Sequence, residues 1–148
     1  MIKKKEGDYM LGIIITGHGQ FATGLQSSVE LIAGKQENFE TIDFEKGESS
    51  EILNNKLKKE VSRMDSQEGV IIFTDIPGGT PFNQSILLSQ EDAQIKVITG
   101  TNLPAIMDGL FNRELEANDF VNKVLRSGKE GLATYEEKRS NIIKEEGI

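Results

Sequence analysis

The sequence of 148 residues contains no cysteine and only one histidine. Without cysteine the chain forms no disulfide, has no thiolate nucleophile and offers no thiolate to a metal ion. One histidine with scattered carboxylates is a weak ligand set for a transition metal, so we expect no metal site and no cofactor. Long apolar runs are also absent: none approaches the roughly 20 residues of a membrane span, and no secretory signal pattern precedes the first apolar run. We therefore expect a cytoplasmic protein.

Basic residues are fewer than acidic ones, which gives a formal net charge of −7. This charge would repel phosphates of nucleic acids and anionic lipids, so proteins or small molecules are the expected partners. The length and the 36% of hydrophobic residues suit one globular domain with its own core. We expect a flexible extension over residues 1–9, one domain over 10–137 and a polar tail over 138–148.

Short apolar runs alternate with amphipathic segments along the chain. The runs predict strands over 11–16, 37–45, 69–75 and 93–100. Helical spacing of apolar residues and start signals predict helices over 21–33, 47–64, 80–88, 101–111 and 118–126. Thr80 followed by Pro81 is interpreted as a helix cap and the first helical residue, and residues 131–135 predict a short closing strand.

This order of elements predicts a single-domain α/β fold with a doubly wound, mostly parallel sheet of four strands. Ligands of such sheets bind beyond the carboxyl ends of the strands, where the strand order reverses. Polar, glycine-containing segments follow three of the strands, at residues 16–19, 74–80 and 99–102. We expect these segments to meet at one edge of the sheet and to form the functional site.

His18 is the first candidate for chemistry at this edge. A lone histidine is more often a surface or structural residue, but Gly17 and Gly19 remove side-chain cover and let the imidazole project into a cleft. Asp75 ends the third strand and could simply cap a turn. If the first and third strands are neighbours, its carboxylate can instead accept a hydrogen bond from one ring nitrogen. The other nitrogen is then a free nucleophile, and a bond to Nδ1 would leave Nε2 exposed.

The segment from Gly78 to Pro81 is the third candidate. Gly78 and Gly79 expose backbone N–H groups, Thr80 adds a hydroxyl, and the following helix points its positive end at the same place. A nucleophilic imidazole, an orienting carboxylate and an anion-binding loop without a metal suggest a phosphohistidine carrier.

Three segments together resemble the mannose-family EIIA domains of the bacterial phosphoenolpyruvate-dependent sugar phosphotransferase system. They are G-H-G at 17–19, D-x-x-G-G-T-P-F-N at 75–83 and VITGTNLPAIMD at 97–108, within a similarity that covers about residues 10–135. The resemblance implies that His18 is phosphorylated, that Asp75 orients it, and that Gly19, Gly78, Gly79 and Thr80 contact the phosphate.

The resemblance also implies partners. Phospho-HPr would donate the phosphoryl group and the EIIB component would accept it, with the membrane components EIIC and EIID served only indirectly. The protein would then be cytoplasmic and could lie at the periphery of the transporter complex. It also implies a homodimer that exchanges a C-terminal antiparallel strand. The negative net charge, in turn, argues against contact with nucleic acid.

Other functions stay open at this point. The phosphotransfer subunit of dihydroxyacetone kinase shares the fold and the early histidine, although the G-G-T-P segment favours a sugar EIIA component. A regulatory module that binds a partner according to the phosphorylation of His18 is a different class, and a metal-free phosphoesterase with a covalent His18 intermediate is a third. The transported sugar is not encoded here, because it contacts only the membrane components.

Overall fold

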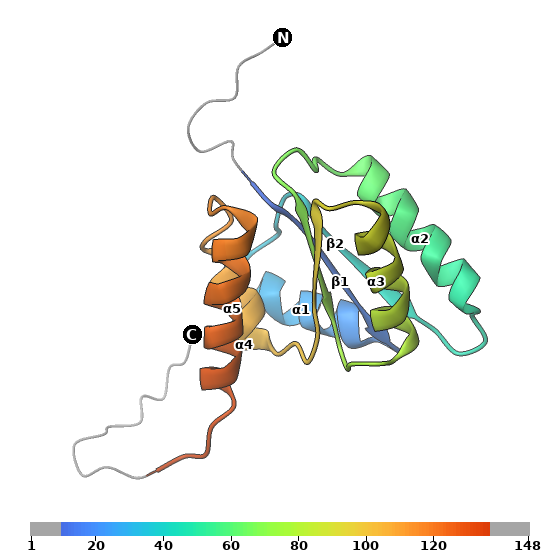
Figure 1. The fold of residues 1–148 in the computed structure, drawn as a ribbon. Helices are drawn as coiled ribbons and strands as arrows, with labels where there is room; N and C mark the ends of the chain where they lie inside the picture. The colour runs from blue at the N-terminus through green and yellow to red at the C-terminus, as the bar shows by residue number, and fades with distance from the viewer. Residues whose placement is uncertain (1–9, 137–148) are drawn as a thin grey trace.

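The computed structural model describes residues 10–136, so the extension expected at 1–9 and the tail expected at 138–148 lie outside the described residues. Strands and helices alternate along the chain, and helices cover both faces of the sheet (Figure 1). The strands are β1 Gly12–His18, β2 Phe39–Phe44, β3 Val70–Thr74 and β4 Ile95–Ile98. The helices are α1 Phe21–Ala33, α2 Ser50–Arg63, α3 Thr80–Glu91, α4 Leu103–Leu110 and α5 Ala117–Gly131.

The four strands form one sheet in the order β2-β1-β3-β4, and every pair is parallel. Parallel neighbours need crossover helices, which bury the sheet on both faces. The apolar run of β1 fits this place, since Ile13, Ile14 and Ile15 are all fully buried. The predicted α/β class and the four-stranded parallel sheet are confirmed. The order reverses between β1 and β3, which puts the expected ligand-binding edge between these two strands.

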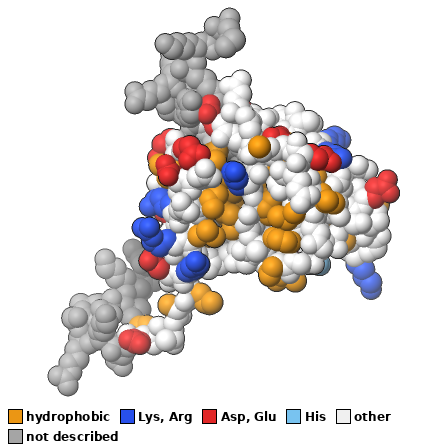
Figure 2. Space-filling view, viewed as in Figure 1, with side chains coloured by type: hydrophobic (Ala, Val, Ile, Leu, Met, Phe, Trp, Pro, Cys, Tyr) orange, Lys and Arg blue, Asp and Glu red, His pale blue; other side chains and the backbone are white. Residues whose placement is uncertain are grey.

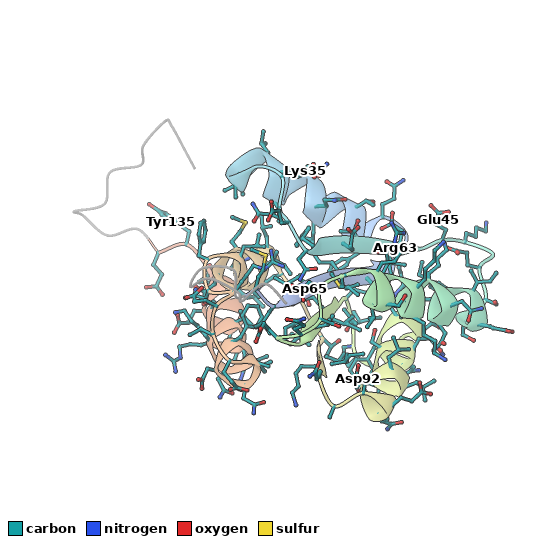
Figure 3. All side chains as sticks on the ribbon, turned by 90° about the horizontal axis from the view of Figure 1, so that it is seen from above. Lys35, Glu45, Arg63, Asp65, Asp92 and Tyr135 are labelled. Carbon is teal, nitrogen blue, oxygen red and sulfur yellow. The ribbon has the colours of Figure 1, made fainter. Side chains whose placement is uncertain are left out.

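Alternate residues of the strands serve two separate cores. Ile13 and Ile15 of β1 point to the face covered by α1, α4 and α5, where Phe73 and Phe120 meet edge to face with ring centroids 6.3 Å apart. Ile14 points to the other face, which α2 and α3 cover. Figure 3 shows the sheet from above, between these two layers of helices. The strand ends are therefore held rigidly from both sides.

The N-cap residue of α4 agrees with the sequence prediction, whereas that of α3 differs from it. Asn102 caps α4 through a 3.1 Å bond from the Ala105 N–H to its side-chain oxygen, as a cap before a proline predicts. Thr80, in contrast, is no cap: the N-cap of α3 is Gly79, and Thr80 is the first helical residue. The chain turns already at Gly78, whose φ is +79°, so the cap and the first helical residue each lie one position before the predicted Thr80 and Pro81.

The closing strand predicted at 131–135 is wrong for the single chain. Helix α5 continues to Gly131, and residues 132–136 form neither strand nor helix. Gly131 stays helical because it packs on Pro104, which a side chain at this position would approach within 2.5 Å. A strand also needs a neighbour that offers free hydrogen-bonding groups, and this segment pairs with no strand among residues 10–136. Leu132 and Tyr135 are consequently exposed, and Leu125 of α5 is 38% exposed.

A buried arginine closes the opposite end of the sheet. The guanidinium of Arg113 donates hydrogen bonds to the backbone oxygens of Leu11, Glu37 and Asn38, which precede β1 and β2. Burial lowers the pKa of Arg113 to about 10, although the nearby Glu37 carboxylate opposes this shift. The group is still a cation at neutral pH, and it donates to three backbone carbonyls, of which that of Asn38 also accepts from the Ile13 N–H.

None of the helices within residues 10–136 is long and apolar enough to cross a membrane.

Candidate active site

His18 and Asp75 meet at the carboxyl ends of β1 and β3. Because these strands are parallel neighbours, with Thr16 opposite Thr74, their carboxyl ends lie side by side. The Nδ1 atom of His18 lies 2.7 Å from Oδ2 of Asp75, and the His18 backbone N–H donates to the same oxygen at 2.9 Å. The other carboxylate oxygen accepts from the Ile76 N–H at 2.9 Å. The contact expected between these two side chains is therefore present.

This geometry fixes the tautomer of the imidazole ring. Burial by itself raises the pKa of the Asp75 carboxyl, but the hydrogen bonds from the His18 N–H, the His18 ring and the Ile76 N–H outweigh it and hold the pKa below its usual value. Asp75 is consequently an anion that can only accept hydrogen bonds. Nδ1 must carry the proton in this contact, which leaves the lone pair of the neutral ring on Nε2.

The two side chains differ in their access to solvent. The Asp75 side chain is 11% exposed, whereas the His18 side chain is 47% exposed. An exposed, correctly oriented imidazole beside a buried carboxylate can act as a nucleophile toward a group that a second protein brings to the surface.

Phe44 and Gly79 hold the imidazole from two further directions. The ring of Phe44, the last residue of β2, meets that of His18 edge to face at a centroid distance of 5.8 Å. A Cβ atom at Gly79 would lie 2.8 Å from Cε1 and 3.5 Å from Nε2 of His18. Gly79 thus provides the space that the imidazole occupies, in addition to the backbone N–H group for which the sequence singled it out.

The loop before α3 presents backbone donors beside this ring. Within the described residues, the N–H groups of Gly78, Gly79 and Thr80 donate to no protein acceptor. The side-chain amide of Asn83 donates to the Gly78 oxygen at 3.2 Å, so this carbonyl is held away from the free N–H groups. The loop and the positive end of α3 together can bind an anion.

The glycines that flank His18 have structural roles, and Gly19 does not offer the free N–H group expected to contact the phosphate. The Gly19 N–H group donates to the Phe44 oxygen at 2.8 Å, so it is already engaged, and we do not count it among the donors for a phosphate. Its φ of +57° explains why glycine stands there. A Cβ at Gly17 would come within 2.5 Å of the Phe21 ring, which packs directly over this position.

The segment after β4 reaches the same edge with its backbone only. The Gly100 N–H donates to the Asp75 oxygen at 3.0 Å, which ties the third and fourth strand ends together. The side chains of this segment line a different hollow, against α5, with Leu125 and Leu132. Only two of the three expected segments therefore contribute side chains next to His18.

Sequence patterns had not singled out Phe44 or Lys46. Phe44 could have been recognised as the apolar residue that ends the second strand, at the edge where the other candidates lie. Among residues 10–136, no three histidine or carboxylate side chains gather in a group that could hold a metal ion.

Comparisons with known proteins agree with the motifs. The EIIA-man family, described as PTS system fructose IIA component, matches residues 12–125. The chain is 31% identical over 130 residues to the PTS system mannose-specific EIIAB component of Escherichia coli strain K12. The matched residues make up 86% of this chain but only 40% of that protein. This chain is 33% identical over 116 residues to the PTS system fructose-specific EIIA component of Bacillus subtilis strain 168, covering 78% of this chain and 80% of that protein.

The fold is similar to a solved structure as well. The crystal structure of phosphotransferase system component EIIA from Streptococcus agalactiae superposes with a TM-score of 0.79 at 40% identity, covering 84% of this chain and 97% of the other. The chain therefore belongs to the mannose family of EIIA components of the sugar phosphotransferase system.

Proposed function

We propose that this protein is a phosphocarrier of sugar uptake, in which His18 accepts a phosphoryl group from phospho-HPr and passes it to an EIIB component. The observation that carries the proposal is the 2.7 Å contact between His18 Nδ1 and Asp75 Oδ2, because it leaves Nε2 as an exposed nucleophile. The names of the relatives, which are mannose- and fructose-specific components, support the assignment to sugar uptake.

The transfer step needs little rearrangement of the protein. The Nε2 lone pair of His18 attacks the phosphorus atom, and the bond from phosphorus to the donor imidazole breaks with its electron pair left on the donor nitrogen. Nδ1 keeps its proton, so the phosphorylated ring becomes a cation. The Asp75 carboxylate, already in place, stabilises this charge without having to move.

The free N–H groups of Gly78, Gly79 and Thr80, with the Thr80 hydroxyl, are the proposed contacts of the phosphoryl oxygens. Phosphoryl transfer depends mainly on in-line positioning and on neutralising these oxygens. Backbone donors at the start of α3 supply part of this without a tight grip, which suits a group that must leave again.

The proposed acceptor distinguishes this role from the alternatives. The match to an EIIA family favours a sugar component over the phosphotransfer subunit of dihydroxyacetone kinase. Such a carrier would work in the cytoplasm, next to the membrane components EIIC and EIID. Purified phosphorylated protein mixed with an EIIB component should lose its phosphoryl group to that protein. Retention of the group on His18, with a competent EIIB present, would contradict the carrier role and favour a regulatory module.

A homodimer is part of the proposal. The outer edge of β4 is unpaired within the described residues, and the hollow of about 360 Å³ between the end of β4 and α5 is largely apolar. Figure 2 shows hydrophobic side chains gathered on this face. Leu132 and Tyr135 are 86% and 66% exposed in the segment that follows α5. We propose that this segment adds a strand to β4 of a second copy, as the resemblance implies.

The exchange would leave the site open. Figure 3 shows Tyr135 and Glu45, which lies in the turn beside His18, on opposite sides of the molecule. Light scattering should give the mass of a dimer for the wild type, and a chain ending at Gly131 should give a monomer. A wild type that stays monomeric at high concentration would contradict the exchange.

A further inference from the structure

The turn after β2 brings a lysine to the rim of the imidazole site. Lys46 lines an open hollow of about 340 Å³ together with His18, Gly19, Phe44 and the rest of the turn, Glu45 to Glu48. A flexible lysine stem can move its ammonium group across a hollow of this size.

The backbone of this turn is held by its own hydrogen bonds. The Glu45 N–H donates to Oε1 of Glu48 at 2.8 Å, and the Glu48 N–H donates to the Glu45 oxygen at 3.1 Å. Gly47, at φ +88°, provides the bend. The position of Lys46 at the rim is therefore set by the fold, and only its side chain is free to move.

The charges around the hollow leave Lys46 without a partner. Lys56 binds the Glu48 carboxylate at 2.5 Å, and its hydrogen bond lowers the pKa of Glu48. Within residues 10–136, no carboxylate lies at ion-pair distance from Lys46. Glu45 and Asp75 place negative charge near His18, so a cation on this side of the ring would reduce the repulsion of a dianionic phosphoryl group on Nε2, beyond what the N–H groups at the start of α3 neutralise.

We propose that the ammonium group of Lys46 binds the phosphoryl oxygens of phosphorylated His18, on the side of the imidazole away from the start of α3. This inference rests on the proposed phosphorylation of His18. Lys46 makes and breaks no covalent bond. Its ion pair exists only after the phosphoryl group has arrived, so it favours the phosphorylated form of this protein over phosphorylated HPr.

The equilibrium constant for transfer from phospho-HPr tests this directly. We expect Lys46→Gln to lower this constant about two- to fivefold, the range of a solvent-exposed ion pair. Lys46→Arg should restore it, and the difference from wild type should shrink in high salt. Lys58→Gln is the matched control, because it removes the same charge from an exposed position of α2 that does not line the hollow.

A second readout follows the phosphoryl group itself. A neighbouring cation stabilises its dianionic form, so phosphorus NMR should show a higher second pKa of the phosphoryl group in Lys46→Gln than in wild type or Lys58→Gln. A purely structural role of Lys46 would leave this titration unchanged.

Two results would overturn the proposal. Equal equilibrium constants and titrations for Lys46→Gln and Lys58→Gln would show that Lys46 does not touch the phosphoryl group. Changed forward and reverse rates with an unchanged equilibrium constant would assign Lys46 to docking of the partner instead. A wild type that takes no phosphoryl group from charged HPr is a separate outcome, which would remove the proposed function and this inference with it.

Discussion

Replacing Gly79 with alanine tests whether the placement of the imidazole controls phosphoryl transfer. The backbone of Gly79 is extended, with φ −78° and ψ 168°, a conformation that alanine adopts without strain. The added Cβ, however, would lie 2.8 Å from Cε1 of His18 and 3.5 Å from Nε2. The substitution therefore acts on the active-site ring and leaves the backbone unstrained.

The size of the effect follows from this contact. Carbon atoms pack at about 3.5 Å or more, so the ring must retreat by about 0.7 Å from the 2.8 Å position. That movement breaks the alignment of Nδ1 with Asp75, now at 2.7 Å, and turns Nε2 away from its line of attack. Misplacements of about 1 Å cost up to about 100-fold in rate, so we expect transfer to slow by about 10- to 100-fold.

The assay is the rate of phosphoryl transfer from phospho-HPr, followed by rapid quenching, with thermal unfolding measured in parallel. Gly24→Ala is the matched control, since a Cβ at this helical position of α1 meets nothing within 4 Å. It should transfer at the wild-type rate and gain about 0.5–1 kcal/mol of stability. A folded Gly79→Ala variant that transfers as fast as the wild type would refute the steric argument.

Further substitutions test the carboxylate and the buried arginine. Asp75→Asn should slow transfer about 10-fold or more, because a neutral amide does not stabilise the cationic phosphorylated ring; an unchanged rate would remove Asp75 from the mechanism. Hydrogen bonds hold the pKa of Asp75 in the folded protein below its usual value of about 3.9. The ionised carboxylate therefore stabilises the fold fully above about pH 3.9, and this stabilisation is lost as the pH falls through the folded-state pKa. The difference in unfolding free energy between wild type and Asp75→Asn should therefore narrow below about pH 4 in urea titrations. Arg113→Met should lower the unfolding free energy by about 3 kcal/mol, because the hydrogen bonds of the guanidinium to three backbone oxygens are lost, and a loss under about 0.5 kcal/mol would contradict this role.

The sheet and the central pair of residues could be predicted from local patterns. Apolar runs as continuous as Ile13–Ile15 are typical of strands buried on both faces, and parallel strands end at one common edge. The glycines around His18 and the aspartate after β3 then mark the same place. Their contact required only that β1 and β3 be neighbours, which the structure confirms.

The walls of the site depend on tertiary packing and could not be predicted in this way. Phe44 and the turn that contains Lys46 lie beside His18 because β2 pairs directly with β1. The pattern at 37–45 predicts a strand but contains no information on its neighbour. The sequence indicates a role for the Gly79 N–H group. It does not indicate that Gly79 leaves space for the imidazole of His18, because that contact joins two residues far apart in the sequence.

The segment after α5 shows that a strand-like pattern does not by itself predict pairing. Residues 131–135 carry a strand-like pattern, yet within residues 10–136 they pair with no strand. A pattern can indicate that a segment is able to pair, but the partner decides whether it does. If the proposed exchange is correct, the pattern describes the dimer and not the isolated chain.

Intact mass after incubation with phosphoenolpyruvate, enzyme I and HPr tests the central claim most directly. We expect the wild type to gain one acid-labile phosphoryl group and a folded His18→Ala variant to gain none. A phosphoryl group on the variant, or none on the wild type while HPr is itself charged, would contradict the assignment of His18 as the phosphorylated residue.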